Sequence, residues 1–238
     1  MYHPFLSRLF PGFSPLFAAL LAAIVCLPVY ARSKELESKI QLRIVCVSSL
    51  AEDQKVVLAS RNDKGKWKEL GTTSLRTSLV TGWLPAQAGE LHLAVMDEGS
   101  LKSICQFTCP ADTRRVLAVL VADPETNIYN AQVVDPVALG FVEGSILICN
   151  FSPHTSSVTL GTKEEKVEAG QQRVVKPDLE GNGMYRVMVS YSDSDDKSVS
   201  CYDRQASGSA NSRDMLFLLP DKNVGLRVLS LPLFGSLD

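Results

Sequence analysis

The sequence predicts an all-β protein, with two tandem antiparallel β-sandwich modules of immunoglobulin-like type behind an N-terminal signal peptide. Two cysteine-centred blocks recur in the same order along the 238 residues, which indicates one module used twice. Short segments of alternating polar and apolar residues are separated by turn residues, and no segment carries a long apolar stripe of helical period. About seven short strands within roughly 90 residues are typical of such a sandwich.

The N-terminus has the layout of a secretory signal peptide. Arg8 is the only charged residue before the apolar run 17–27, and the motif Val29-Tyr30-Ala31 resembles a signal-peptidase site. We therefore expect cleavage after Ala31 and export to the periplasm or the extracellular space. The alternative is an uncleaved anchor, which would be the only membrane contact. The apolar run is shorter than the roughly 20 residues that a membrane span needs.

The repeat predicts how the rest of the chain is divided. Removing 31 residues from 238 leaves 207, enough for two domains of common size. The segment between the modules is too apolar for a flexible Gly/Ser linker, so we expect the modules to pack together. The expected division is a signal peptide (1–31), a polar N-terminal segment (32–39), module 1 (40–136), a short linker (137–144), module 2 (145–233) and a tail (234–238).

The repeated blocks place a cysteine on four predicted strands. Residues 43–48 are echoed by residues 146–151, and residues 103–107 by residues 199–202. Because successive side chains of a strand point to opposite faces, alternation puts Cys46 on the apolar face of its strand. The same reasoning turns the other three cysteines toward a core: Cys105, Cys149 and Cys201.

Export makes disulfides possible, and the repeat suggests which. We expect equivalent bridges, Cys46 with Cys105 and Cys149 with Cys201, each stabilising its module by roughly 3 to 4 kcal/mol. The alternative is that these cysteines stay reduced as small buried apolar residues. Cys109 is left over, either as a free thiol or as a competitor for Cys46. No second thiol pair or histidine cluster accompanies Cys105 and Cys109, so the sequence predicts no metal site there.

Charge excludes one class of partner. The chain has 24 Lys and Arg against 26 Asp and Glu, a formal net charge of −2, with both signs interspersed. Nucleic-acid binding needs clustered cations, so we expect no nucleic-acid partner.

The sequence assigns no catalytic, cofactor-binding or metal-binding residue. It contains no Gly-x-Ser-x-Gly elbow, phosphate-binding loop or dinucleotide fingerprint. His92 lies within a predicted strand and is expected to be structural, whereas His154, in a turn, is kept as a candidate functional residue. Trp67 lies between two lysines of a predicted hairpin, and we expect its ring to point toward the core.

An acidic loop gives the remaining candidates. Its carboxylates suit a hard cation such as Ca²⁺, but the glycine and glutamate of a calcium-binding loop do not follow, which favours a solvated loop. The candidate residues are Asp193, Asp195 and Asp196.

Module 2 resembles bacterial exported β-sandwich repeats. The residues that carry the resemblance are 148–152, 158–161, 167–171 and 185–189. The families it resembles include the alginate-acetylation accessory protein of the periplasm and domains of unknown function. The resemblance covers most of module 2 and part of module 1, implies an exported protein, and transfers no functional residue.

The sequence therefore favours an exported, non-enzymatic binding or scaffolding protein of the bacterial envelope, with a protein or polysaccharide partner and no cofactor. The alternative is an accessory or enzymatic component of exopolysaccharide modification. A pocket that holds His154 or His92 beside a carboxylate and a hydroxyl would favour the alternative. A flat apolar patch between the modules would favour scaffolding.

Overall fold

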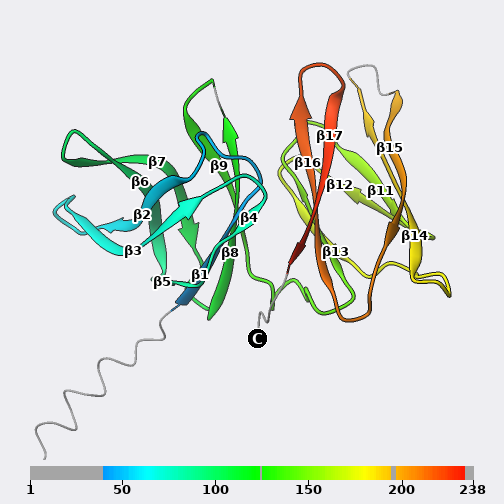
Figure 1. Ribbon diagram of the computed structural model, residues 1–238, viewed down its shortest axis with the longest axis horizontal. Coiled ribbons are helices and arrows are strands. Elements are labelled where there is room, and N and C mark those ends of the chain that lie inside the picture. Colours follow the sequence, from blue (N-terminus) through cyan, green and yellow to red (C-terminus); the bar gives the residue numbers. More distant parts are fainter. Residues whose placement is uncertain (1–39, 124, 194–196, 234–238) are drawn as a thin grey trace, which may run out of the picture. The chain divides into compact units, whose positions relative to one another are not determined.

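The computed structural model describes residues 40–123, 125–193 and 197–233 (Figure 1). The predicted signal peptide, its cleavage site, residues 32–39 and the tail lie outside these ranges, as do Asp195 and Asp196. The described residues form strands, turns and loops without a helix, so none of them belongs to a helix that could cross a membrane. The predicted all-β class is confirmed.

The first sandwich consists of two sheets (Figure 1). One has the strand order β4-β1-β8-β9, with β5 also paired to β1, and the other has the order β3-β2-β6-β7. Its strands are β1 (Ile40–Cys46), β2 (Gln54–Arg61), β3 (Trp67–Leu75), β4 (Leu79–Val80), β5 (Leu84–Ala86), β6 (Gly89–Asp97), β7 (Ser100–Cys109), β8 (Arg115–Asp123) and β9 (Ile128–Val134).

The second sandwich repeats this plan. Its sheets have the orders β13-β10-β16-β17 and β12-β11-β14-β15. Its strands are β10 (Ile146–Asn150), β11 (Ser156–Leu160), β12 (Lys163–Val167), β13 (Gln172–Val175), β14 (Met184–Ser192), β15 (Ser198–Ser207), β16 (Arg213–Asp221) and β17 (Gly225–Leu233).

The two sandwiches share one topology, except that β4 and β5 together take the place beside β1 that β13 takes beside β10. In each, the first strand pairs with the penultimate strand in parallel: β1 with β8, and β10 with β16. The other pairings are antiparallel, so the predicted tandem of antiparallel sandwiches is correct except for one parallel pair in each. The module limits 40–136 and 145–233 stay predictions.

Each sandwich has its own apolar core. Ile40, Leu42, Ile44 and Cys46 all enter the first core, as the alternation predicts, and each is at most 2 % exposed. The second core takes the inward residues of β10, β11, β14 and β16. Burial of apolar side chains stabilises each sandwich by roughly 25 cal/mol per Å² removed from water.

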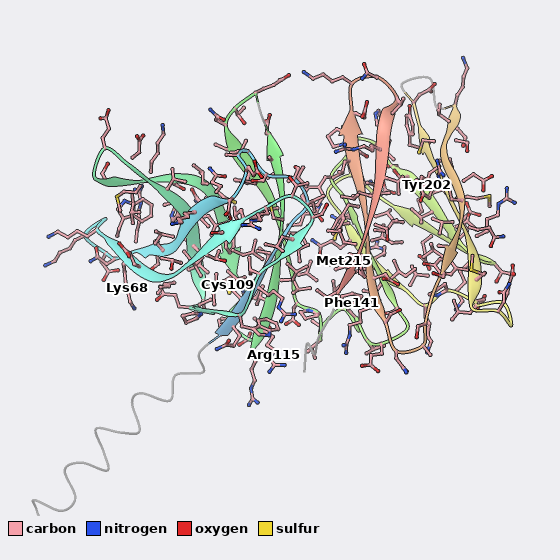
Figure 2. The ribbon with its side chains drawn as sticks, in the orientation of Figure 1. Lys68, Cys109, Arg115, Phe141, Tyr202 and Met215 are labelled. Atoms are coloured by element: carbon pink, nitrogen blue, oxygen red, sulfur yellow. The ribbon has the colours of Figure 1, made fainter. Side chains whose placement is uncertain are left out.

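A third cluster, here called the shared core, takes side chains from both sandwiches. Val119 on β8 belongs to it, as do Met215 and Phe217 on β16. Phe141 joins it from the segment between β9 and β10 and is 3 % exposed (Figure 2). The Gln132 side chain also donates a 2.8 Å hydrogen bond to the Asn150 carbonyl. The connecting segment is therefore anchored by its own aromatic residue.

Strand registers show that the repeated cysteines of β1 and β10 are not equivalent. Val45 on β1 pairs with Val119, and Cys149 on β10 pairs with Phe217; all four lie in the shared core. Cys149 therefore corresponds to Val45, while Cys46 points into the first core. The predicted repeat is real, but its first cysteine match is one residue out of register.

The second cysteine match is displaced in the same way. A β-bulge falls after Leu93 in the β6–β7 pair and after Val189 in the β14–β15 pair. The extra residue is Ile104 in the first sandwich and Cys201 in the second, so these two correspond. Cys105 corresponds instead to Tyr202.

Candidate functional site

The five cysteines in the described part of the chain are thiols. Cys46, Cys105, Cys109, Cys149 and Cys201 are all free in the structure, so neither predicted bridge is formed. Cys149 lies in the shared core, whereas Cys201 packs against the core of the second sandwich, so these two face different clusters. The alternative, small buried apolar residues, describes them better. Cys109 also lies in the first core.

Burial makes two of these thiols unreactive. Desolvation raises the pKa of Cys46 and that of Cys105 to about 12. Because the thiolate is the reactive form, we expect Ellman's reagent at pH 8 to modify neither thiol in the native protein and both in denaturing urea. Rapid modification of either residue in the native state, mapped by mass spectrometry, would contradict this placement.

The same shift predicts an alkaline loss of stability. The pKa is raised in the folded state, so the stabilisation is fully present below the ordinary value near 9 and is lost as the pH rises toward about 12. We expect the urea midpoint to fall over this window, and to fall less in the Cys46→Ala and Cys105→Ala double variant. If the urea midpoint falls equally steeply with pH in both proteins, groups other than these two thiols cause the alkaline loss of stability.

A cavity of about 740 Å³ is the candidate functional site, here called the loop cavity. The residues that follow β1 and β10 line it, together with the ends of the β8–β9 and β16–β17 hairpins. Its lining includes Ser48, Leu50, Val121, Asp123, Glu125, Asn130, Phe151, Pro153, His154, Leu219, Pro220, Asp221, Lys222, Gly225 and Arg227.

The two sandwiches contribute corresponding loops to the loop cavity. Leu50 and His154 lie in the loops that follow the matching strands β1 and β10; Asp123 and Asp221 end the matching strands β8 and β16. The chemistry of the two loops differs, because the first presents leucine and the second presents histidine. The repeat thus builds a cavity with two unlike walls.

Asn150 fixes the loop that carries His154. Its buried side-chain amide donates to the carbonyls of His154, Val167 and Glu168 at 2.8 to 3.2 Å. Its Oδ1 accepts hydrogen bonds from the Ser152 amide at 2.9 Å and the Ser152 hydroxyl at 2.7 Å. Asn150 is 0 % exposed, so this network determines the path of the loop.

Tyr129 fixes the matching loop of the first sandwich. Its hydroxyl donates to Gln54 Oε1 at 2.6 Å and accepts from the Leu50 amide at 3.0 Å. The ring is 3 % exposed and belongs to the first core. Both loops of the cavity are therefore held by hydrogen bonds to a buried side chain.

Tyr191 connects the His154 loop to the β16–β17 hairpin. Its ring lies 4.8 Å from the His154 ring, centroid to centroid, and its hydroxyl donates to the Val224 carbonyl at 3.3 Å. Gly225 has φ +76°, and a Cβ there would overlap the Tyr191 hydroxyl. Only glycine fits this position without displacing the tyrosine.

We therefore expect Gly225→Ala to cost more stability than Gly65→Ala. Gly65 has nearly the same φ, +71°, with nothing within 4 Å of an added Cβ, so its substitution measures the backbone cost alone, about 1 kcal/mol. At Gly225 the overlap adds about 1 to 3 kcal/mol. Urea unfolding of both variants tests this, and equal losses would contradict it.

The charged groups of the loop cavity are already engaged. A hydrogen bond from the Thr126 side chain and one from the Glu125 amide lower the pKa of Asp123. The amides of Asn223 and Val224 lower the pKa of Asp221, and the charge of Arg227 adds to this. Lys222 and Glu125 form an ion pair between the two hairpins.

Trp67 and His92 form a second constellation, on the outer face of the β3-β2-β6-β7 sheet. His92 is 3 % exposed; its Nδ1 lies 3.0 Å from Ser103 Oγ and its Nε2 lies 2.9 Å from Glu90 Oε1. Trp67 packs edge-on against His92, at 5.0 Å, and under Arg61 at 4.4 Å. The expectation that Trp67 points into the core is wrong. Its ring lies on the outer face of the sheet, where His92 and Arg61 cover it.

The acidic loop offers no assembled cation site among the residues described. Asp193 accepts a hydrogen bond from the Lys197 amide at 2.9 Å, and Asp195 and Asp196 lie outside the described ranges. No group of three potential metal ligands was found in the described part of the chain.

Sequence reasoning identified His154 but missed its partners in the cavity. Asn130 and Arg227 come from β9 and β17, far from His154 along the chain. Each lies on the second strand of a hairpin whose first strand ends in an aspartate, Asp123 or Asp221. The repetition of this aspartate in the two copies was the signal that the sequence offered. Only the strand registers place them around one cavity.

No protein-family model matches the chain, and no curated protein does. Among solved structures, the chain is similar to a candidate cell adhesion protein from Bacteroides uniformis. The identity is 10 %, over 83 % of this chain and 98 % of that chain, with a TM-score of 0.28. At this level the similarity says nothing about function, and the fold rests on the sheet topology described above.

Proposed function

We propose that the chain is an exported, non-enzymatic binding protein of the bacterial envelope that holds its ligand in the loop cavity. The observation that carries the proposal is the cavity itself, about 740 Å³, lined by corresponding loops of both sandwiches. Ligand pockets commonly have this size and often lie where two folded units meet. The N-terminal apolar segment supports export, and cleavage after Ala31 stays a prediction.

Filling the cavity tests the proposal. Asn130 is an exposed side chain on the cavity wall, so Asn130→Trp should block the cavity without disturbing a core. Asn211→Trp, at an exposed position in the turn between β15 and β16, is the matched control. The probes are soluble glucans, uronate polysaccharides, peptidoglycan and a mixture of peptides, measured by affinity electrophoresis, co-sedimentation and calorimetry. We expect the native and control proteins to bind a probe that the blocked variant does not bind.

Two results would contradict binding in the loop cavity. One is that the native protein binds none of these probes. The other is that Asn130→Trp and Asn211→Trp bind equally well, which would move the binding surface elsewhere.

The constellation at His92 favours a second candidate function, ester hydrolysis in exopolysaccharide modification. A hydroxyl, an imidazole and a carboxylate lie in hydrogen-bond contact, the arrangement that activates a serine nucleophile. It ranks second because Ser103 also donates to the Cys105 carbonyl at 3.2 Å, and because these side chains do not line the loop cavity. Labelling of Ser103 by a fluorophosphonate, lost in His92→Asn, would favour hydrolysis over binding alone.

A further inference from the structure

The charges of the loop cavity are largely balanced by other groups of the protein. Three carboxylates and two cations line it: Asp123, Asp221 and Glu125 against Lys222 and Arg227. Asp123 and Asp221 accept hydrogen bonds from backbone amides of their own turns, and Glu125 is paired with Lys222. The charge of Arg227 acts on Asp221, so the formal sum of −1 opposes an anion, and the engaged carboxylates leave little to attract a cation.

Three uncharged groups in the cavity remain open to a ligand. Among the residues described, the Asn130 side chain and the His154 ring nitrogens make no hydrogen bond. Ser48 Oγ accepts from the Ala122 amide at 2.9 Å and keeps its own hydrogen to donate. A side-chain amide and a hydroxyl each provide both donors and acceptors, and the two imidazole nitrogens add hydrogen-bonding positions, so together they suit a ligand whose groups both donate and accept.

Apolar side chains form the rest of the walls. Phe151, Pro153 and Pro220 come from the second sandwich, and Leu50 and Val121 from the first. Such walls suit a ligand with apolar ring faces between its polar groups. A peptide would be held mainly by main-chain hydrogen bonds along a sheet edge, whereas the open groups here are side chains.

We propose that the loop cavity recognises a neutral oligosaccharide, with Asn130, His154 and Ser48 as its hydrogen-bonding residues. This rests on the proposed function, because it names the ligand class of the same cavity. Hydroxyl groups of the sugar form hydrogen bonds with these three side chains, and the sugar ring packs on Phe151, Pro153 and Pro220. Because no ion pair forms with the ligand, its affinity depends little on salt.

Calorimetry on the full mature protein tests the ligand class. The probes are neutral gluco-oligosaccharides and oligomers of N-acetylglucosamine, with oligouronates and a sulfated oligosaccharide as charged counterparts and an uncharged peptide of similar size. We expect binding of a neutral sugar, less than a twofold change in Kd between low and high salt, and at least tenfold weaker binding of the charged sugars.

Two substitutions test the residues. Asn130→Asp keeps the shape but replaces two donors by a negative charge, and His154→Phe keeps the ring on Tyr191 but removes both nitrogens. Each should weaken neutral-sugar binding about tenfold, the effect expected for the loss of about one hydrogen bond. Asn211→Asp carries the same charge change outside the cavity and should leave Kd unchanged. Urea unfolding of each variant separates lost binding from lost folding.

The outcomes separate the two proposals. Selective binding of an oligouronate or a peptide, blocked by Asn130→Trp, would overturn the neutral-sugar inference and leave the binding function standing. Neutral-sugar binding with an unchanged Kd in Asn130→Asp and His154→Phe would overturn the residue assignment. Absence of binding by any probe would overturn both.

Discussion

Replacing Asn150 by alanine is expected to lower the free energy of unfolding by about 3 kcal/mol or more. The side chain is 0 % exposed and satisfies three carbonyls and the Ser152 amide. Removing it leaves buried donors and acceptors with fewer partners, and each such loss is costly because water cannot replace the amide. Asn150→Asp should cost still more, because a carboxylate would face carbonyl oxygens.

The corresponding residue of the first sandwich is the control. Cys46 occupies the position of Asn150 and makes only a weak 3.3 Å thiol contact with the Ser48 carbonyl. Cys46→Ala should cost about 1 kcal/mol, the effect of a small cavity. Urea unfolding measures both variants. A loss below 1 kcal/mol for Asn150→Ala would show that the loop is held by other contacts.

Phe217→Ala is expected to cost about 3 to 5 kcal/mol. The ring is fully buried in the shared core, where β16 of the second sandwich meets side chains of the first. Trp83 packs against the shared core itself, whereas Trp67 lies on the other sheet of the first sandwich, so the fluorescence of Trp67 in a Trp83→Phe background reports on a sandwich that does not contain the substitution. The urea midpoint measured by fluorescence should nevertheless fall.

Leu229→Ala is the control for this substitution. Leu229 is half-buried and packs at the margin of the same shared core, so its truncation should cost clearly less than that of Phe217. If Phe217→Ala lowers the stability of the second sandwich but leaves the tryptophan transition unchanged, the two sandwiches do not stabilise each other through this cluster.

Local patterns were enough to predict the fold class. The alternation over residues 40–46 predicted the buried face of β1 correctly, because one face of a sheet packs on a core and the pattern repeats every second residue. The same rule placed Cys149 on a buried face, but it could not say which core that face joins, because β10 is buried on both faces, one against its own core and one against the shared core. Such a strand is apolar throughout, and its sequence cannot give its register.

The candidate site was less predictable for a related reason. His154 could be singled out because its turn is polar, but Asn130 and Arg227 look like ordinary exposed strand residues. They become site residues through the packing of two sheets. Cys105 and Cys201 do not correspond, because Cys201 is the extra residue of its β-bulge whereas Cys105 follows the extra residue of the matching bulge, and a sequence alignment of the two blocks does not reveal these bulges.

Equilibrium unfolding of the native protein, followed by two probes, tests most directly whether the two copies form one body through the shared core. Tryptophan fluorescence reports on the first sandwich, and far-ultraviolet circular dichroism reports on the strands of both. Coincident urea transitions with one midpoint are expected. Two separated transitions, with fluorescence following only one of them, would contradict a shared core and with it a cavity built by both sandwiches.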